Sequence, residues 1–352
     1  MLICREIGGV QSQLDTAAYQ ALWTRSKGLS RAAIEAALWR RRTLVKTSLM
    51  RQTIHLIPAD EFHLYIAALR ANRIAGALGV MARCGISPKE ADHFTTIIMK
   101  TVDDLSAETP VAGVARRALR DAVRPQVSKK IQKYMDKVWS IVRLPVAEGL
   151  LCYGENQGSE AVWVRADHWL SRPKSAPEEE AQNFLFRRYL AAYGPASLRD
   201  FSKWAGISAK DAARIGAASV DSVVEVTAAG TRALLLRKDC EALAAAGISA
   251  PVVRLLPHFD TFVLGHVDKS SLVDMRHYKK VYRNQGWISP VLLIDGRIAG
   301  TWSYALRSGR LVLGIKPFGK LARTLQEAIE VEAQSLAVFF GYSSPPVVTI
   351  RS

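Results

Sequence analysis

One order of elements, short helices followed by a β-hairpin, can be predicted three times along this chain of 352 residues. Residues 15–42 contain two stretches with helical spacing of apolar side chains, and residues 43–57 are rich in β-branched side chains, as in a hairpin. The same order is predicted over residues 110–165 and again over residues 183–237. Because helices followed by a hairpin are typical of a winged helix-turn-helix unit, the pattern predicts three such units in tandem.

The last hundred residues have a different character. Apolar runs at 252–257, 261–267, 287–306 and 310–318 predict short strands, and residues 320–341 predict a closing helix. Asp295-Gly296 is the strongest hairpin signal in the chain. The predicted fold is therefore mainly α with α+β parts, and it has four domains. These are winged helix 1 with a linking helix (1–85), winged helix 2 (86–175), winged helix 3 (176–249) and a small β-rich α+β domain (250–352).

Basic side chains exceed acidic ones. Lys and Arg number 48 against 32 Asp and Glu, which gives a net charge of +16, more than the roughly 2–8 that solubility asks of a small domain. Residues 1–176 carry 26 basic and 16 acidic side chains, and residues 177–352 carry 22 and 16, so the first half is expected to hold more of a polyanion. Nucleic acid is the leading candidate, and charge that serves solubility alone is the alternative.

Cysteine usage and hydropathy exclude other classes. The cysteines, Cys4, Cys84, Cys152 and Cys240, form no CxxC pair, so neither a zinc ribbon nor a disulfide framework is indicated. No stretch reaches the roughly 18 uncharged apolar residues of a membrane span, and the charges at Arg5–Glu6 interrupt any export signal. We expect a cytoplasmic protein, associated with the nucleoid if bacterial, without membrane contact, metal or cofactor.

Three motifs follow one another along the chain. They are GGVQSQ (Gly8–Gln13), MRQTIHLIP (Met50–Pro58) and LLPHFDTFVLGHVDK (Leu255–Lys269). Together they resemble the AlkZ/YcaQ family of winged-helix DNA glycosylases over nearly the whole chain. The resemblance implies hydrolysis of the N-glycosidic bond of alkylated purines, with Gln11 and Gln13 as the catalytic QxQ residues. A QxQ triplet alone arises by chance roughly once in two chains of this length, so a solvated loop is the alternative.

The chain departs from the family pattern twice. Only Met1–Ile7 precede the glutamine motif, where family members have a further helix, so the first winged helix is expected to be truncated. The third motif ends in Asp268-Lys269 where Asp-Arg is expected, and a lysine cannot reproduce a bidentate guanidinium contact.

The two glutamines restrict the chemistry. A purine alkylated at N7 is cationic and leaves easily, so a carboxamide that positions a water under C1′ is sufficient. Because glutamine does not titrate and is a poor general base, we expect action on labile cationic lesions only, such as N7-alkylguanine or its interstrand crosslinks. Three winged units in one chain favour a monomer on damaged duplex DNA. A transcription regulator and a catalytically inactive DNA-binding relative are the alternatives.

Basic side chains near the predicted wings and helices are expected to neutralise phosphates, with solvated helix ends as the alternative. The resemblance adds a DNA-facing or supporting role for the histidine of the second motif. Trp23, Trp39 and Trp204 fall in apolar helical patterns and are expected in the core. The predicted DNA-binding residues are Arg40, Arg41, Arg42, Lys46, Arg51, His55, Lys129, Lys130, Lys133, Lys137 and Arg297.

The third motif contains two His-x-Asp pairs, His258 with Asp260 and His266 with Asp268. On strands, each pair would share one face and could suggest the metal site of a nuclease. Polar ties that hold the strands of the last domain are the favoured interpretation, because the motif is part of the family resemblance.

Overall fold

The computed structural model describes residues 2–170, 175–228, 230–247, 251–307 and 309–351. They form two compact units. The first unit comprises Ala36–Phe186 and Ala205–Ala218, and the second comprises Leu2–Glu35, Arg187–Trp204 and Ser219–Ser352. Both helices and sheets are present, so the fold is mixed α+β, whereas the four predicted domain ranges stay a prediction.

The predicted hairpin over residues 43–57 is confirmed in the first unit. Strands β2 (Leu44–Ser48) and β3 (Ile54–Pro58) pair antiparallel with Lys46 opposite Leu56. A π-helix, η1 (Ala36–Arg40), precedes them, and Arg41 N donates to Ala36 O. The turn between the strands holds Arg51 and Gln52 in the left-handed region, with φ of 54° and 58°. The basic end of the helix and the turn of the hairpin therefore have defined backbones.

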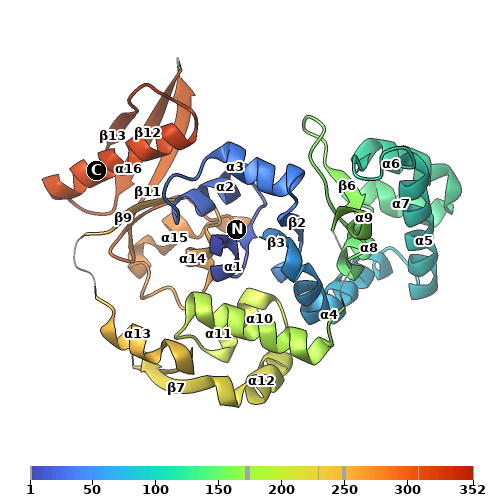
Figure 1. Cartoon of the computed structure of the whole chain (residues 1–352), viewed down its shortest axis with the longest axis horizontal. Helices are drawn as coiled ribbons and strands as arrows, with labels where there is room; N and C mark the ends of the chain where they lie inside the picture. The colour runs from blue at the N-terminus through green and yellow to red at the C-terminus, as the bar shows by residue number, and fades with distance from the viewer. Residues whose placement is uncertain (1, 171–174, 229, 248–250, 308, 352) are drawn as a thin grey trace. The chain divides into compact units, whose positions relative to one another are not determined.

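Most of the remaining first unit is helical, and its helices can be followed in Figure 1. Its core contains the buried rings of Phe94, Tyr134 and Trp163. Ser87 and Glu90 form a capping box at the start of the helix that begins at Pro88. The helices are α4 (Phe62–Ala82), α5 (Pro88–Leu105), α6 (Arg116–Val123), α7 (Lys129–Lys137), α8 (Arg143–Glu148) and α9 (Ala166–Trp169).

The two β-runs predicted near residues 151–165 are also confirmed. Strands β5 (Leu151–Tyr153) and β6 (Val162–Arg165) pair antiparallel, β4 (Val114–Ala115) joins β6, and β5 joins β2. The Pro/Ser/Glu-rich residues 171–180 are typical of a linker or of a helix lead-in. Residues 171–174 lie outside the described part of the chain, and a helix begins at Glu178.

Helix α10 (Glu178–Tyr193) ends where the sequence places Gly194-Pro195, and α11 (Leu198–Ala205) and α12 (Ala209–Ala218) follow with Gly206 between them. A hairpin of β7 (Val223–Ala228) and β8 (Thr231–Leu236) comes next, and α13 (Cys240–Ala245) follows it. The predicted helices and hairpin are present here, and their assembly into a winged helix stays a prediction.

The second unit contains a five-stranded sheet in the order β13-β12-β11-β10-β9. Asp295 and Gly296, with φ of 49° and 79°, form the turn between β10 and β11, which confirms the predicted hairpin. Helix α16 (Arg323–Phe339) packs against β9 through its apolar side. The strands are β9 (Val253–Leu256), β10 (Val291–Ile294), β11 (Arg297–Arg307), β12 (Arg310–Pro317) and β13 (Val347–Ile350).

The strand predicted over residues 261–267 is wrong. A helical turn, α14 (Thr261–Leu264), begins there because the Asp260 side chain accepts a hydrogen bond from Phe262 N at 2.9 Å. This cap overrides the β-propensity of the segment. The sequence also gave no indication of β13, which pairs parallel with β12.

The N-terminal segment of the second unit contains α1 (Leu2–Glu6), β1 (Val10–Gln11), α2 (Asp15–Trp23) and α3 (Arg31–Glu35). Trp23 is buried and stacks on Phe339 of α16 with ring centroids 5.7 Å apart, as expected for a core residue. In the described part of the chain no helix is long and apolar enough to cross a membrane.

Candidate active site

The two glutamines lie on a short turn between α1 and α2. Gly8 and Gly9, with φ of 69° and 90°, reverse the chain after α1, and β1 then ends at Gln11. Ser12, between the glutamines, donates its hydroxyl to Asp15 Oδ1 at 2.8 Å, at the start of α2. Gln11 is buried with 7% of its surface exposed, whereas Gln13 is exposed. Of the two motif glutamines, one is therefore an exposed residue and the other a buried one.

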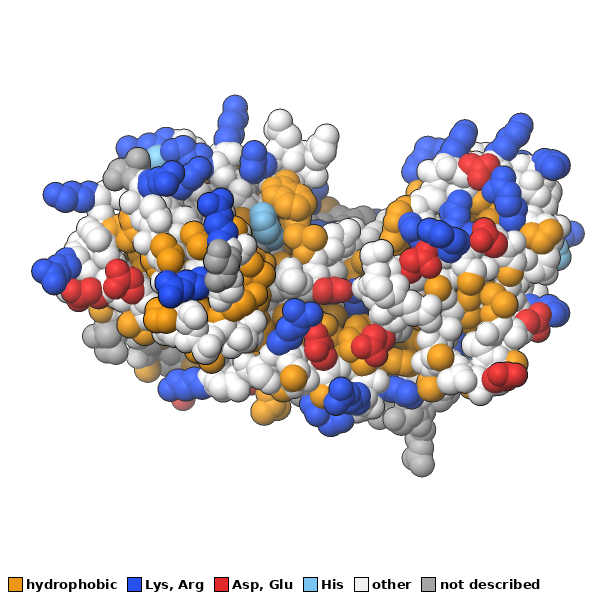
Figure 2. Space-filling model, turned by 90° about the horizontal axis from the view of Figure 1, so that it is seen from above, with side chains coloured by type: hydrophobic (Ala, Val, Ile, Leu, Met, Phe, Trp, Pro, Cys, Tyr) orange, Lys and Arg blue, Asp and Glu red, His pale blue; other side chains and the backbone are white. Residues whose placement is uncertain are grey.

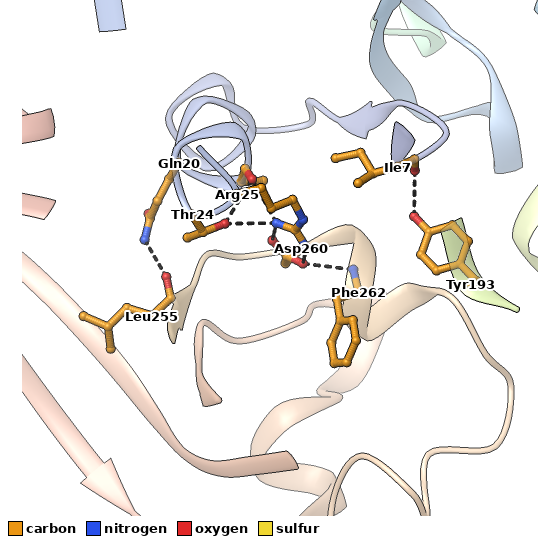
Figure 3. A network of polar contacts seen from close by, with 9 residues as sticks. Ile7, Gln20, Thr24, Arg25, Tyr193, Leu255, Asp260 and Phe262 are labelled. Carbon is orange, nitrogen blue, oxygen red and sulfur yellow. Dashed lines mark hydrogen bonds and ion pairs between the residues drawn. The ribbon is translucent and has the colours of Figure 1, made fainter. Parts of the chain in front are cut away.

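An aromatic cluster fixes the chain just before the glutamines. Tyr193 donates its hydroxyl to Ile7 O at 3.0 Å, as Figure 3 shows. A Cβ on Gly8 would lie 3.2 Å from the indole of Trp204, so this close approach, like the positive φ, requires glycine. Trp204 is buried beside Tyr189 and Tyr193, which confirms it as a core residue. The glycines of the motif thus have a local structural reason.

A buried ion pair fixes the chain after the glutamines. Arg25, just beyond α2, donates from Nη2 and Nη1 to the two carboxylate oxygens of Asp260, at 2.7 and 2.9 Å (Figure 3). The Asp260 carboxylate is fully buried, and it also caps α14. Burial lowers the pKa of Arg25, but the carboxylate raises it more, so the pKa lies above its usual value. A second tie joins Gln20 Nε2 to Leu255 O at 3.1 Å.

These contacts determine what the turn can do chemically. The carboxamide of Gln13 offers an acceptor oxygen and an amide donor without carrying charge, and it cannot serve as a strong base. Because the turn is tied on both sides, the position of Gln13 depends on the fold of the second unit as a whole. A preorganised group of this kind can orient a water molecule without the cost of ordering a loop.

The members of the two His-x-Asp pairs make hydrogen bonds within the second unit. His258 Nδ1 contacts Ile288 O at 2.8 Å, and His266 Nε2 contacts Pro195 O at 3.3 Å. Asp268 accepts from Ser270 N, and the Lys269 ammonium donates to the carbonyls of Val263 and His266. The pairs do not share strand faces, because this segment is not a strand. Within the described residues, no group of three or more His, Cys, Asp or Glu side chains could hold a metal.

Two predicted DNA contacts on the first hairpin are buried. Lys46 is 6% exposed, and its ammonium lies 5.6 Å from the ring centroid of Tyr153. His55 is 2% exposed, its Nδ1 contacts Thr53 O at 2.9 Å, and burial, together with the charge of Arg51, lowers its pKa to about 3. We therefore assign both side chains to support of the hairpin rather than to direct DNA contact.

The other predicted basic residues are more accessible. Arg40 and Arg41 are exposed, Arg51 is half-buried in the hairpin turn, and Arg42 lies with its guanidinium 4.5 Å from the ring centroid of Trp169. Figure 2 shows that Lys and Arg side chains are widely spread on the face in view, where acidic side chains are fewer. The accessible arginines thus stay candidates for phosphate contact.

The four predicted lysines of α7 are exposed, as is Arg297 at the start of β11. Lys130 is committed to an ion pair with Glu90 at 2.5 Å and to Gly85 O at 3.0 Å. The hydrogen bond from Lys130 is the main reason that the pKa of Glu90 falls to about 2. The α7 stripe is therefore partly neutralised by its own surroundings, and its DNA contact stays a prediction.

Sequence reasoning missed the residues that hold the glutamine turn in place. Arg25, Tyr193 and Asp15 carry no motif that identifies them, and Arg25 is separated from its partner Asp260 by 235 positions. The third motif supplied the only signal, because Asp260 belongs to it.

Comparisons with known proteins bear on this site. A family model described as DNA glycosylase AlkZ-like matches residues 4–339. An interstrand DNA cross-link repair glycosylase from Streptomyces sahachiroi is 30% identical over 318 residues, which cover 87% of this chain and 81% of the relative. The solved structure of Streptomyces sahachiroi DNA glycosylase AlkZ matches with a TM-score of 0.84 at 27% identity and covers 99% of this chain and 92% of that one.

Proposed function

For this chain, which belongs to the AlkZ-like DNA glycosylase family, we propose the hydrolysis of the N-glycosidic bond of N7-alkylated purines in duplex DNA. The family of the chain makes it a DNA glycosylase by relationship. The proposal adds the substrate class, the role of the two glutamines, and action on purines that are joined across the two strands in interstrand crosslinks, since the relative in Streptomyces sahachiroi bears the name of a cross-link repair enzyme.

The proposed reaction breaks the bond between C1′ and N9. The electron pair of this bond leaves with the purine, which was cationic and departs neutral, and the sugar passes through an oxocarbenium-like transition state. A water held by Gln13 attacks C1′ and releases a proton to solvent, which leaves an abasic site. The carboxamide oxygen of Gln13 accepts a hydrogen bond from this water. This hydrogen bond becomes stronger as positive charge builds on the sugar and the water is polarised.

The exposure of Gln13 on an anchored turn is the observation that carries this proposal. Gln11, buried beside it, is given the role of a positioning residue that fixes the path of the turn. The absence of a titrating group among the two side chains limits the proposed activity to lesions whose leaving group is already activated.

The test is a base-release assay on a duplex with one N7-methylguanine and on the same duplex with an N7-linked interstrand crosslink. Free base from the first substrate, and separated strands from the second, are the expected results, while an undamaged duplex stays intact. Tight binding of either damaged duplex without release would instead support the inactive relative, and preference for one undamaged sequence would support a transcription regulator.

A further inference from the structure

A basic and aromatic surface of the second unit, which sequence reasoning did not single out, follows α14. It comprises the last three residues of the short helix α15 (Tyr278–Val281) and the chain that follows it as far as Trp287. We call these residues, 279–287, the 279–287 loop. Lys279, Lys280 and Arg283 are exposed, and no acidic residue occurs between Met275 and Ile294. Such a local excess of positive charge attracts a polyanion, and DNA is the polyanion of the proposed function.

The 279–287 loop has a fixed shape. Tyr282 and Ile288 form an antiparallel bridge, and Arg283 N donates to Trp287 O at 2.8 Å, so these two residues face each other across the loop. Gln285 lies in the left-handed region with φ of 59°, a conformation that costs a non-glycine residue about 1–3 kcal/mol and persists only when the surroundings hold it. Val281, fully buried, anchors the helical part.

Trp287 is exposed although its neighbours brace it. The residue is 40% exposed, while the rings of His258 and Phe259 meet its indole at centroid distances of 5.0 Å and angles of 62° and 78°. At these angles neither ring lies parallel to the indole, so neither is stacked on it. An exposed, braced indole is suited to stack on a flat partner.

Arg283 and Trp287 occupy opposed backbone positions of the loop, so a cationic residue and an aromatic residue belong to the same surface. This combination fits one chemical partner, a nucleotide whose base is unpaired. Aromatic side chains stack on unpaired bases regardless of sequence, while neighbouring cations track the phosphates. A base pair inside a duplex covers both faces of each base and cannot stack on the indole in this way.

We propose that the 279–287 loop is a DNA-contact surface that holds an unpaired base against Trp287, with Arg283 and Lys279 on the adjoining phosphates. The proposal rests on the proposed function in one respect, the identification of DNA as the polyanion. It deepens that function, because enzymes that act on a base in duplex DNA commonly take a nucleotide out of the stack, which leaves its pairing broken.

The test uses undamaged DNA, so that it does not depend on base release. Three labelled probes are compared by fluorescence anisotropy: a perfect duplex, the same duplex with one unpaired 2-aminopurine, and the single strand. Trp287→Ala is expected to weaken binding of the last two by about fivefold or more and to leave the perfect duplex unchanged. Stacking quenches 2-aminopurine, so this quenching is expected with the parent protein and with Trp287→Phe, and is lost in Trp287→Ala.

Arg283→Ala is compared with Arg323→Ala, which removes the same charge from an exposed site on α16. The first change is expected to reduce the slope of log K against log salt for the single strand by about 0.7, and the second to leave it unaltered. Equal losses from Trp287→Ala on all three probes, or no loss on any, would overturn the proposal. Retained base release in that case would leave the proposed function standing, whereas quenching without any base release would sink the proposed function alone.

Discussion

Arg25 and Asp260 are 235 positions apart in the chain, yet they form a bidentate ion pair with N–O distances of 2.7 and 2.9 Å. The pair joins the segment after α2 to the N-terminus of α14, and the carboxylate has no exposed surface. Arg25 lies just beyond the C-terminal end of α2, the helix that follows the two glutamines. The geometry of the candidate active site therefore depends on a contact with the third sequence motif.

Asp260→Ala is expected to lower the free energy of unfolding by about 3–5 kcal/mol, because it leaves a partly buried guanidinium without its partner and α14 without its cap. Chemical denaturation would measure the loss. The exposed pair of Arg323 and Glu327 provides the control, and Glu327→Ala should cost less than about 1 kcal/mol. The double variant with Arg25→Met and Asp260→Leu should lose less unfolding free energy than the sum of the losses measured for these two substitutions separately. Strict additivity of the two losses would contradict an energetic coupling between the residues.

Gln13→Ala is expected to slow the release of N7-methylguanine at least tenfold, equivalent to about 1.4 kcal/mol of transition-state stabilisation, with nearly unchanged affinity for damaged DNA. Gln11→Ala should have a smaller effect on release, because Gln11 acts by positioning, and the double variant should lose less than the sum in activation free energy. Gln13→Asp should keep substantial activity, since a carboxylate also accepts from the water.

Gln157→Ala, in the exposed turn between β5 and β6, is the matched control for these glutamine substitutions and should release base at the parent rate. Single-turnover release together with equilibrium binding separates chemistry from affinity. If Gln11→Ala and Gln13→Ala both release base as fast as the parent, the glutamines are ordinary turn residues and the assignment is wrong.

His55 predicts a pH dependence of stability. Its pKa is about 3 in the folded protein, against roughly 6.5 in an unfolded chain, so the unfolded state binds more protons between these values. Stability is therefore fully present above the unfolded pKa and falls as the pH drops from about 6.5 toward 3. His55→Gln should reduce the loss of unfolding free energy between pH 7 and pH 4, and His93→Gln, exposed on α5, should not. An unchanged pH profile in His55→Gln would contradict the burial of a neutral imidazole.

One arginine substitution and one lysine substitution distinguish DNA contact from support of the fold. Arg41→Ala, at an exposed site, should weaken binding to undamaged duplexes equally for all sequences. It should also reduce the slope of log K against log salt by about 0.9. Lys46→Ala, at a buried site over Tyr153, should lower thermal stability and leave the salt slope unchanged. A sequence-selective loss in Arg41→Ala would favour a transcription regulator instead.

Much of the local structure was predictable because its causes are local. Helical spacing of apolar side chains identified α2 and α16, β-branched runs identified the β2–β3 hairpin, and Asp295-Gly296 identified the turn between β10 and β11. The family and the candidate glutamines came from motifs, whose value lies in their combination along the chain. None of these signals requires knowledge of what lies opposite in space.

Tertiary structure alone decided which of the candidate side chains can meet a substrate. Lys46 and His55 are residue types that often contact DNA, but both are buried, Lys46 against Tyr153 and His55 against Thr53. Asp260 turned a β-type run into a helical cap and became the partner of Arg25, and Trp287 stayed partly exposed although the rings of two neighbours contact it. Periodicity and turn chemistry act over a few residues, whereas burial and long-range pairing are fixed only when distant segments of the chain pack together.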